Sequence, residues 1–420
     1  MRVLIIGAGI GGLTTALSLH EAGIEALVVD AARLLRPLGV GINLLPHAVR
    51  ELTELGLGDD LADIGVPTAE MVHFDRFGGR IWADPRGRAL GYDWPQYSVH
   101  RGELQMALLD AVLSRLGKDA VRTGTALEGF EQDGGRVRAR LLDRVSGTAG
   151  TVEADVLVGA DGLHSAVRAR LYPDEPAPLW NGIRMWRGVT ESEPFLTGRT
   201  LAVAGSNAHS KMVVYPISMR AERRGRALLN WVAEVKLEGD RRAGAADWNR
   251  KGRLEDVLPH FADWTFDWLD VPALIKGTAE ILEYPMVDRE PLDRWTFGRV
   301  TLVGDAAHPM YPIGSNGGSQ AVLDARVLAY ELARTADPGD GLLAYERERR
   351  ETANAVVLAC RDMPAERILR MVSERAPEGF DAIEDVLTAE ELARLTGAYR
   401  RTSFIDAEAL NGRPSYSVAR

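Results

Sequence analysis

The chain of 420 residues is 46% hydrophobic and 26% charged, which is typical of a globular protein with two or three domains. Its net charge of −10 disfavours nucleic acid as a main partner, and no apolar run approaches the roughly 20 residues needed to span a bilayer. The single cysteine, Cys360, excludes an internal disulfide. Because the sequence also opens directly on a strand-like run without a signal peptide, we expect a cytoplasmic protein with no membrane partner.

A strand, a glycine-rich turn and a helix are predicted at the start of the chain. The apolar run 3–6 is followed by GAGIGG at 7–12, and leucine and alanine then recur at helical spacing. The motif's glycines allow a tight turn, a close approach of the backbone to a pyrophosphate, and close packing of helix on strand. In that order they are Gly7, Gly9 and Gly12. A second strand, 24–29, ends at Asp30, which can accept hydrogen bonds from an adenosine ribose, so the stretch predicts a dinucleotide-binding Rossmann unit.

Strand-like runs rich in valine, tyrosine, tryptophan and methionine lie between about residues 180 and 290. They read GIRMWRGV, TLAVAG, KMVVYPI, ALLNWVAEV and AEILEYPMV, and they predict a sheet with one apolar face that roofs a substrate pocket. Between the last two runs, FADWTFDWL at 261–269 favours a helix or a loop. No second Rossmann fingerprint occurs here, so we expect no separate domain for a nicotinamide nucleotide.

A second strand–turn–helix unit is predicted within VTLVGDAAHPMYPIGSNGGSQA at 300–321. Gly304 and Asp305 form the turn, and a glycine cluster opens the helix. That cluster comprises Gly314, Gly317 and Gly318. The positive end of this helix can stabilise the isoalloxazine edge that becomes anionic on reduction, and Asp305 can bind ribityl hydroxyls between the two units. NAD has neither of these groups, so the two cradles together predict FAD as the cofactor.

Three motifs resemble those of the single-component flavoprotein aromatic hydroxylases, which share the p-hydroxybenzoate hydroxylase fold. They are GAGIGG at 7–12, DVLVGADGLHSAVR at 155–168 and GDAAHPMYPIGSNGG at 304–318. Further stretches are similar to the phenazine-carboxylate monooxygenases of pigment biosynthesis. These stretches are RPLGVGIN at 36–43, PQYSVHRGELQM at 95–106, MWRGVTE at 185–191, GRLEDVLP at 252–259 and YPMVDR at 284–289. The likeness extends to about residue 361.

The resemblance implies an α/β fold in which an antiparallel substrate-binding sheet is inserted into a Rossmann-like FAD-binding domain. We expect the FAD-binding domain to comprise residues 1–72, 98–178 and 291–361. The substrate-binding domain would then comprise 73–97 and 179–290. Residues 362–420 would form a helical segment whose polar tail, NGRPSYSVAR, is typical of a disordered terminus.

The resemblance also implies roles for single residues. The first motif would bind the ADP half of FAD, and Asp305 the ribityl chain. Other cofactor contacts would come from Gly39 and Gly41 in a mobile loop, Arg101 and Gln105 near the pyrophosphate, Asp161, Gly162 and Arg168 in the middle motif, and Gly304. Pro312 would turn its carbonyl toward the substrate ring, beside the helix start at Gly314, Gly317 and Gly318. Many relatives read G-Q-G-x-N after this proline, so a side-chain contact at Ser319 is not implied.

Aromatic and apolar residues of the sheet and its neighbours are the candidates for substrate binding. They are Leu44, Tyr97, Trp186, Tyr215 and Tyr284. We expect about half of the aromatic candidates to be ordinary core residues. We expect His47 to be structural or to line the pocket. His308 could be either a turn residue or a neighbour of the flavin. We expect Cys360 to be an unreactive core residue.

The resembling family reduces FAD with NADH or NADPH and inserts oxygen into an aromatic ring through a C4a-hydroperoxyflavin, so we expect these co-substrates and an aromatic, fused-ring substrate. No metal-ligand cluster or Ser/His/Asp grouping is evident. A flavin-dependent halogenase should carry W-x-W-x-I-P, which the chain lacks. A decarboxylating or epoxidising monooxygenase and a non-catalytic flavin-binding redox protein remain as alternatives, and the protein would be a monomer or a homodimer.

Overall fold

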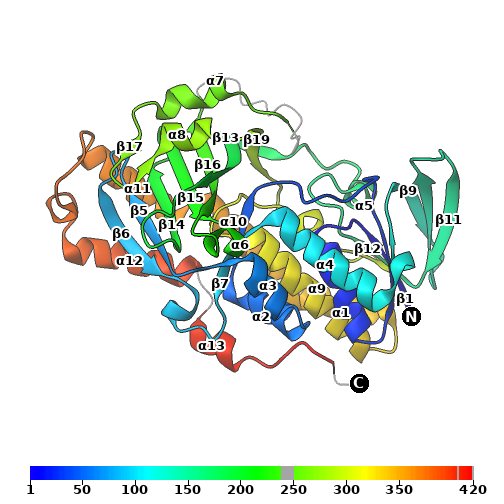
Figure 1. Cartoon of the computed structure of the whole chain (residues 1–420). Coiled ribbons are helices and arrows are strands. Elements are labelled where there is room, and N and C mark those ends of the chain that lie inside the picture. Colours follow the sequence, from blue (N-terminus) through cyan, green and yellow to red (C-terminus); the bar gives the residue numbers. More distant parts are fainter. Residues whose placement is uncertain (238–249, 404–405, 419–420) are drawn as a thin grey trace.

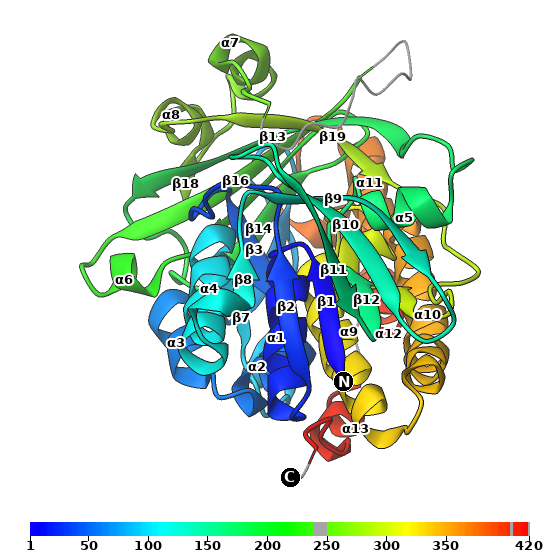
Figure 2. The ribbon, with the colours of Figure 1, turned by 90° about the vertical axis from the view of Figure 1, so that its right-hand side faces the viewer.

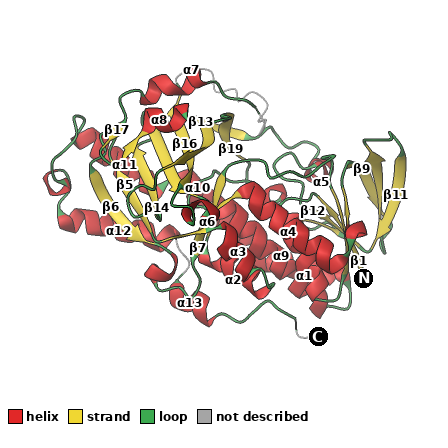
Figure 3. Cartoon of the chain, in the orientation of Figure 1, coloured by secondary structure: helices red, strands yellow, loops and turns green. Residues whose placement is uncertain are grey.

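The computed structural model describes residues 1–237, 250–403 and 406–418. Figure 1 shows that the chain forms two parts, one rich in helices around a parallel sheet and one built on a larger sheet. In Figure 3 the helices of the first part lie side by side, whereas strands dominate the second part. The α/β class predicted from the sequence is therefore confirmed.

The parallel sheet has five strands in the order β20-β12-β1-β2-β8. They are β1 (Arg2–Ile6), β2 (Glu25–Val29), β8 (Val121–Arg122), β12 (Val156–Gly159) and β20 (Val300–Leu302). Most residues of β1 and β2 are buried, as expected for strands covered on both faces. In Figure 2 strand β1 rises from the N-terminus toward the larger sheet, so the carboxyl ends of the parallel strands face that sheet. Ligands of open α/β sheets bind at this edge.

Helices pack around the parallel sheet and share one hydrophobic core with it. Helix α1 contacts α4 and α9, and α9 also contacts α2 and α10. The helices of this part are α1 (Ile10–Glu21), α2 (Pro46–Glu54), α3 (Gly58–Ile64), α4 (Arg101–Leu116), α5 (Ala166–Leu171), α9 (Asn316–Arg334) and α10 (Pro338–Asp362). Because α1 follows β1 directly and α9 follows β20 after one loop, both predicted strand–turn–helix units are present.

Two smaller antiparallel sheets accompany the parallel one. Strands β9 (Thr125–Gln132), β10 (Val137–Asp143) and β11 (Ala149–Ala154) form an outlying sheet at the right edge of Figure 1. Strands β3 (Gly41–Leu44), β4 (Val66–Thr68) and β7 (Gln96–His100) form the other, with β7 in the middle. Pairing of β3 with β7 brings the loop after β2 next to the first turn of α4.

The larger sheet has seven strands in the order β19-β13-β16-β15-β14-β5-β6, and within the described residues its pairings are antiparallel except that of β14 with β5. The strands are β5 (Glu70–Phe74), β6 (Arg80–Pro85), β13 (Leu179–Ser192), β14 (Thr200–Gly205), β15 (Ser210–Pro216), β16 (Ala227–Lys236) and β19 (Leu282–Asp288). All five strand-like runs predicted from the sequence lie in it. The stretch 261–269 also contributes to a short hairpin, β17 (Thr265–Phe266) and β18 (Leu269–Asp270), because its aromatic residues pack into the core under the sheet.

Alternate residues of β13 project from opposite faces of the larger sheet. Trp186 lies opposite Glu283 of β19 and packs in a core with α7 and α8, on what we call the outer face. Met185 lies opposite Tyr284 and packs with Tyr311 of the other part, on the inner face. The short helices of this part are α6 (Met219–Glu222), α7 (Leu254–Val257) and α8 (Val271–Lys276). None of the helices in the described ranges is long and apolar enough to cross a membrane.

The segment after α10 is helical, as predicted, but its tail is held by specific contacts. It contains α11 (Pro364–Arg375), which packs on the larger sheet, α12 (Ala389–Ser403) and α13 (Ala407–Gly412). Arg50 on α2 donates to the carbonyl oxygens of Leu410 and Arg413 at 2.7 and 2.6 Å, and Ser415 bonds to Glu54 at 2.6 Å. The expectation of a disordered tail was therefore wrong, because charged groups of α2 bind it. The domain boundaries given above remain a prediction.

Candidate active site

The turn between β1 and α1 has the construction that its glycines predict. Gly7 has a φ of +107°, a left-handed conformation that favours glycine, and a Cβ at Gly12 would collide with the Gly7 carbonyl oxygen. Gln105 from α4 donates to the Ala8 carbonyl oxygen at 2.7 Å, and the Asp30 carboxylate accepts from the Ala8 amide at 2.8 Å. These contacts hold the turn, which we call the first cradle, in a single position.

Two glycines near the first cradle leave free space around them. A Cβ built at Gly9 or at Gly162 would meet no other heavy atom within 4 Å. Gly9 caps α1, whose free amides and dipole favour an anion. Asp161 accepts from the Ser165 hydroxyl at 2.5 Å and from the Ala166 amide at 2.7 Å. The Asp161 carboxylate therefore caps α5, and the open surface of this motif is at Gly162.

The second cradle is the turn after β20 together with the start of α9. Gly304 in this turn has a φ of +58°. The side chain of Asp305 is exposed, yet burial by the surrounding protein raises its pKa, while the nearby His308 and Arg101 oppose that rise. A carboxylate that water reaches although protein surrounds it lies in a recess rather than on a convex surface. Asp305 can therefore bind a ligand without having to displace protein contacts.

Helix α9 begins after a loop that carries the other predicted residues. Gly314 and Ser315 both adopt left-handed conformations, with φ of +70° and +62°, and Pro312 is exposed. A Cβ at Gly317 would lie 3.8 Å from the Asp305 carboxylate, so the start of α9 and Asp305 face each other. The first turn of α9 therefore offers free amides close to Asp305.

Two further residues of α9 connect the second cradle to β3. A Cβ at Gly318 would lie 3.7 Å from Ile42 Cδ1. Ser319 is fully buried, and its hydroxyl oxygen accepts from the Leu45 amide at 3.0 Å. At the position where the chain departs from the family motif, Ser319 therefore makes a contact within the protein.

Arg168 supports the second cradle from below and does not reach its open surface. Its guanidinium donates to the carbonyl oxygens of Ala306 and Ala307 at 3.0 and 2.9 Å and pairs with Glu175 at 2.5 Å. The residue is 1% exposed. The predicted contact between Arg168 and the cofactor does not fit this burial. The guanidinium instead binds protein groups, and it supports the backbone of the turn that carries Asp305.

Asp324 of α9 joins the second cradle to the core beneath it. Its carboxylate accepts from the Gly304 amide at 2.9 Å, from His308 at 2.6 Å and from Arg349 at 2.9 Å. Burial alone would raise the pKa of Asp324, but His308 and Arg349 outweigh it and hold the pKa below its usual range. His308 is thus a buried turn residue tied to Asp324.

His47 on α2 is buried close to the same charges and is structural. Burial, with the charges of Arg349 and Arg413, lowers the pKa of His47 from 6.5 to about 3. Its Nε2 atom makes no hydrogen bond with the described residues. The imidazole therefore stays neutral in the folded protein over the physiological pH range.

We expect the unfolding free energy of the wild-type protein to fall by about 2 kcal/mol between pH 7 and pH 5 because of His47. In a His47→Phe variant this part of the fall should be absent. The unfolded chain binds a proton near pH 6.5, whereas the folded chain does so only near pH 3, so stability falls as the pH falls through this window. Denaturant unfolding at both pH values measures the loss. His209→Gln, at an exposed histidine, is the control, and parallel pH curves for wild type and His47→Phe would contradict this role.

A polar cluster projects from the inner face of the larger sheet toward β3. Arg187 Nη2 and Tyr215 Oη both donate to the Gly41 carbonyl oxygen, at 2.5 and 2.9 Å, and Asn230 Oδ1 accepts from the Gly41 amide at 2.7 Å. Tyr284 lies beside them, with its ring centre 6.0 Å from the Arg187 guanidinium carbon. Burial raises the pKa of both Tyr215 and Tyr284, so both phenols are uncharged at neutral pH. We call these five residues the arginine–tyrosine cluster.

The arginine–tyrosine cluster lies next to the second cradle. Ile42, which follows Gly41 of the cluster in β3, lies 3.7 Å from where a Cβ at Gly318 near the start of α9 would be. Tyr311 and Ile313, from the loop before α9, pack against Tyr284 in one apolar cluster. The structure therefore places the arginine–tyrosine cluster beside the loop that contains Pro312 and beside the start of α9.

Sequence reasoning chose the wrong residue of β13. Trp186 packs in the core of the outer face and donates to Glu283 at 3.2 Å, so it faces away from the cradles. Its neighbour Arg187 occupies the inner face instead. The alternation of GIRMWRGV could have revealed it, because Arg187 is the cation among the inward-facing Ile183 and Met185.

Other predicted positions also differ from their expected places. Leu44 is fully buried in the core around the parallel sheet, and Tyr97 on β7 packs against that same core, so neither extends the arginine–tyrosine cluster. Gly39 lies in a partly exposed loop with a φ of +107°, whereas Gly41 is fixed in β3 rather than in a mobile loop. Burial raises the pKa of Cys360 to about 12, in keeping with an unreactive core thiol.

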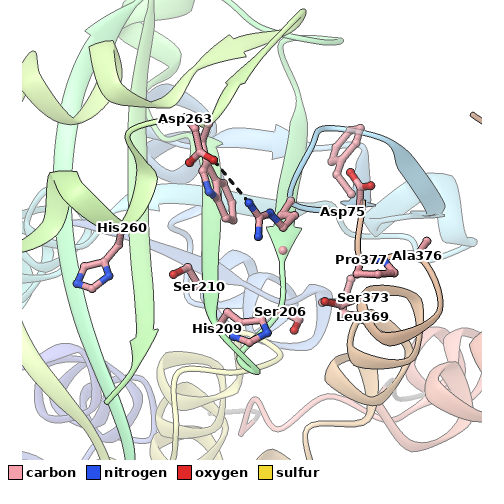
Figure 4. Close-up of a pocket in the computed structure, with 14 residues that line it drawn as sticks. Asp75, Ser206, His209, Ser210, His260, Asp263, Leu369, Ser373, Ala376 and Pro377 are labelled. Carbon is pink, nitrogen blue, oxygen red and sulfur yellow. Dashed lines mark ion pairs between the residues drawn. The ribbon is translucent and has the colours of Figure 1, made fainter. Parts of the chain in front are cut away.

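A cavity of about 110 Å³ lies away from these residues (Figure 4). It is formed by the β5–β6 and β14–β15 turns, the segment before β17 and the end of α11. Arg76 pairs there with Asp263 at 3.5 Å, and Asp75 accepts from the amides of Phe77 and Gly79 at 2.9 and 2.7 Å. Because these groups stabilise their own turns and no predicted site residue lines the cavity, its volume does not mark the reaction site.

The fold and the two cradles define a flavin-binding oxidoreductase with a large sheet beside the carboxyl ends of its parallel strands. Residues 1–359 match the family model described as FAD binding domain. The chain belongs to this family, and within it to the FAD-dependent aromatic hydroxylases, for which NADH or NADPH is the usual co-substrate. The glycine turns, the free space at Gly9 and the recessed Asp305 fit FAD.

Known proteins of this kind match the chain over nearly its whole length. It is 49% identical over 400 residues to the phenazine 1,6-dicarboxylic acid hydroxylase PhzS of Lysobacter antibioticus, covering 95% of this chain and 96% of that protein. The structure of Klebsiella pneumoniae HpxO complexed with FAD and uric acid matches with a TM-score of 0.72 at 25% identity, covering 98% of this chain and 93% of that one. A salicylate hydroxylase substrate complex has the same fold, with a TM-score of 0.71 at 21% identity and coverage of 99% and 98%.

Proposed function

We propose that this FAD-dependent aromatic hydroxylase acts on a fused-ring aromatic carboxylate of the phenazine type. The observation that carries the proposal is the 49% identity, over 95% of the chain, to an enzyme named for phenazine 1,6-dicarboxylic acid. The apolar cluster around Tyr284 and Tyr311 supports it, because a flat aromatic ring needs such a wall. The single buried cysteine supports action in the cytoplasm.

The two cradles are proposed to hold FAD at its two ends. The first cradle would bind the ADP half through Gly7, Gly9, Gly12, Asp30 and Gln105. The second would bind the ribityl chain through Asp305 and the flavin ring beside Gly314, Gly317 and Gly318, with Arg101 and Gly162 at the border between the halves. Once reduced by NADH or NADPH, bound FAD supplies the activation of O2 and the transfer of one oxygen atom to the ring.

The chain's own part in the reaction is to place the ring and keep water away. Tyr311 and Ile313 would press the substrate against the inner face of the sheet, where Met185 and Tyr284 continue the apolar surface. Dry surroundings prevent wasteful release of peroxide. The loop 31–40, with Gly39 and two exposed leucines, is proposed to move when the substrate enters, so that the nicotinamide nucleotide reduces the cofactor quickly only when a substrate is bound.

Anaerobic stopped-flow reduction by NADH and by NADPH, with and without phenazine-1,6-dicarboxylate, tests this proposal. We expect the carboxylate to accelerate reduction well above the basal rate, and aerobic turnover with labelled oxygen to add one labelled atom to the product. Equal reduction rates with and without the ring, and no oxygenated product, would reject the substrate class. Benzoate and salicylate serve as single-ring controls.

The alternatives differ in the product that they give. A decarboxylating hydroxylase would yield a product that gains oxygen and loses one carboxylate, whereas an epoxidase would act on an isolated double bond. A non-catalytic redox protein would keep its FAD and give no oxygenated product. Mass spectrometry of the same reaction identifies the decarboxylating hydroxylase, and a second reaction with an aromatic substrate that carries an isolated double bond separates the epoxidase from the redox protein.

A further inference from the structure

Arg187 is a deeply placed cation without an acidic partner. Its Nη2 donates to the Gly41 carbonyl oxygen, but its buried Nε makes no hydrogen bond with any described residue, and no ion pair with a described carboxylate reaches it. Four buried arginines of the first part are paired with carboxylates: Arg50 with Glu54, Arg168 with Glu175, Arg326 with Glu51 and Arg349 with Asp324. A guanidinium that is largely withdrawn from water is costly unless an anion accompanies it.

The surroundings of Arg187 supply further donors and no negative charge. Tyr215 and Tyr284 are neutral phenols, for the reason given above. Asn230 spends its oxygen on the Gly41 amide, and its Nδ2 is buried without a hydrogen-bond partner among the described residues. Among the described residues, the arginine–tyrosine cluster therefore contains two buried donors without a hydrogen-bond partner, Arg187 Nε and Asn230 Nδ2.

We propose that Arg187 binds a carboxylate group of the aromatic substrate and thereby makes the enzyme select anionic rings over neutral rings of the same shape. A guanidinium recognises a carboxylate through paired, charge-assisted hydrogen bonds, which no neutral amide can match. The part-exposed side chain faces the apolar cluster around Tyr284, so a ring carried on that carboxylate would lie on the inner face of the sheet. This inference rests on the proposed function, because it concerns the same substrate side.

Equilibrium binding to the oxidised holoenzyme tests the inference without turnover. Phenazine-1-carboxylate and the neutral phenazine-1-carboxamide are titrated separately, and the change in flavin absorbance reports binding. We expect wild type to prefer the carboxylate at least tenfold. Arg187→Gln should weaken carboxylate binding about 100-fold and leave carboxamide binding within about threefold, since loss of two hydrogen bonds to a charged group is of that size.

The matched control lies on the same strand. Arg184→Gln removes a guanidinium from the outer face of β13, where it is 37% exposed and lies 3.5 Å from Glu283, and it should leave both affinities unchanged. Arg187→Lys keeps the charge without the paired geometry and should retain a reduced preference for the carboxylate. It also carries the test if Arg187→Gln does not fold.

The possible outcomes distinguish a failure of the role assigned to Arg187 from a failure of the proposed function. If Arg187→Gln and Arg187→Lys keep the wild-type ratio of carboxylate to carboxamide affinity, Arg187 is only a support for Gly41 and the inference is overturned. A purely structural role would weaken both ligands equally, which also overturns it. If wild type binds neither phenazine, the proposed function fails, and this assignment fails with it.

Discussion

Gly12→Ala is expected to give a protein that retains almost no FAD. The added Cβ would collide with the Gly7 carbonyl oxygen, which belongs to the backbone of the first cradle and cannot turn aside as a side chain would. Separating α1 from β1 to make room costs about 1–3 kcal/mol in a packed core and moves the amides that face the pyrophosphate. Flavin absorbance of the purified protein, relative to its protein absorbance, measures the loss.

Substitutions at two neighbouring glycines distinguish the effect on helix packing from the effect on the approach of the ligand. Gly11→Ala should retain FAD, because its Cβ would meet Ala321 Cβ at 3.4 Å and Val303 Cγ2 at 4.0 Å, which are ordinary contact distances. Gly9→Ala should leave the melting temperature of the apoprotein unchanged but weaken FAD binding, since its Cβ meets no protein atom and would occupy the predicted pyrophosphate position. A yellow Gly12→Ala protein with normal flavin content would show that the first cradle does not hold the cofactor.

Asp324→Ala is expected to destabilise the protein by about 3–5 kcal/mol and to release FAD. The substitution leaves Arg349 buried without its counterion and deprives the Gly304 amide and His308 of their shared acceptor. Because Gly304 precedes Asp305, the second cradle should loosen as well. Thermal unfolding of the apoprotein measures the first effect, and flavin retention on dilution measures the second.

An exposed acid of α10 provides the comparison for Asp324. Glu351 has 88% of its side chain exposed and lies 3.9 Å from Arg350, so Glu351→Ala should change the unfolding free energy by less than about 0.5 kcal/mol. If Asp324→Ala is as stable as Glu351→Ala and holds FAD equally well, the network beneath the second cradle has no supporting function.

The cradles could be predicted from the sequence because their requirements are local. A few adjacent residues determine the left-handed turn at Gly7 and the helix start after Gly314. Asp305 follows in the same way from a strand end and a turn. Such short-range patterns do not depend on how distant segments pair.

The substrate side could be predicted only in outline, because it depends on long-range pairing. The alternation along β13 separates Trp186 from Arg187, but which of the two faces lies toward the cradles depends on how the larger sheet packs against distant segments such as Tyr311. Likewise, the contact between Arg413 and Glu51 joins residues 362 positions apart, so no local pattern indicated that the tail would be bound.

The order of the strands also decides when the protein can acquire its cofactor during synthesis. Strand β20 completes the sheet that β1 begins, yet about 300 residues separate the two along the chain. At a translation rate of about 5–20 residues per second, the first cradle leaves the ribosome roughly 15–60 seconds before the second exists. Once β12 has been made, its edge stays unpaired until β20 follows about 140 residues later. A site that holds FAD at both ends can therefore be completed only after β20 and α9 have been made.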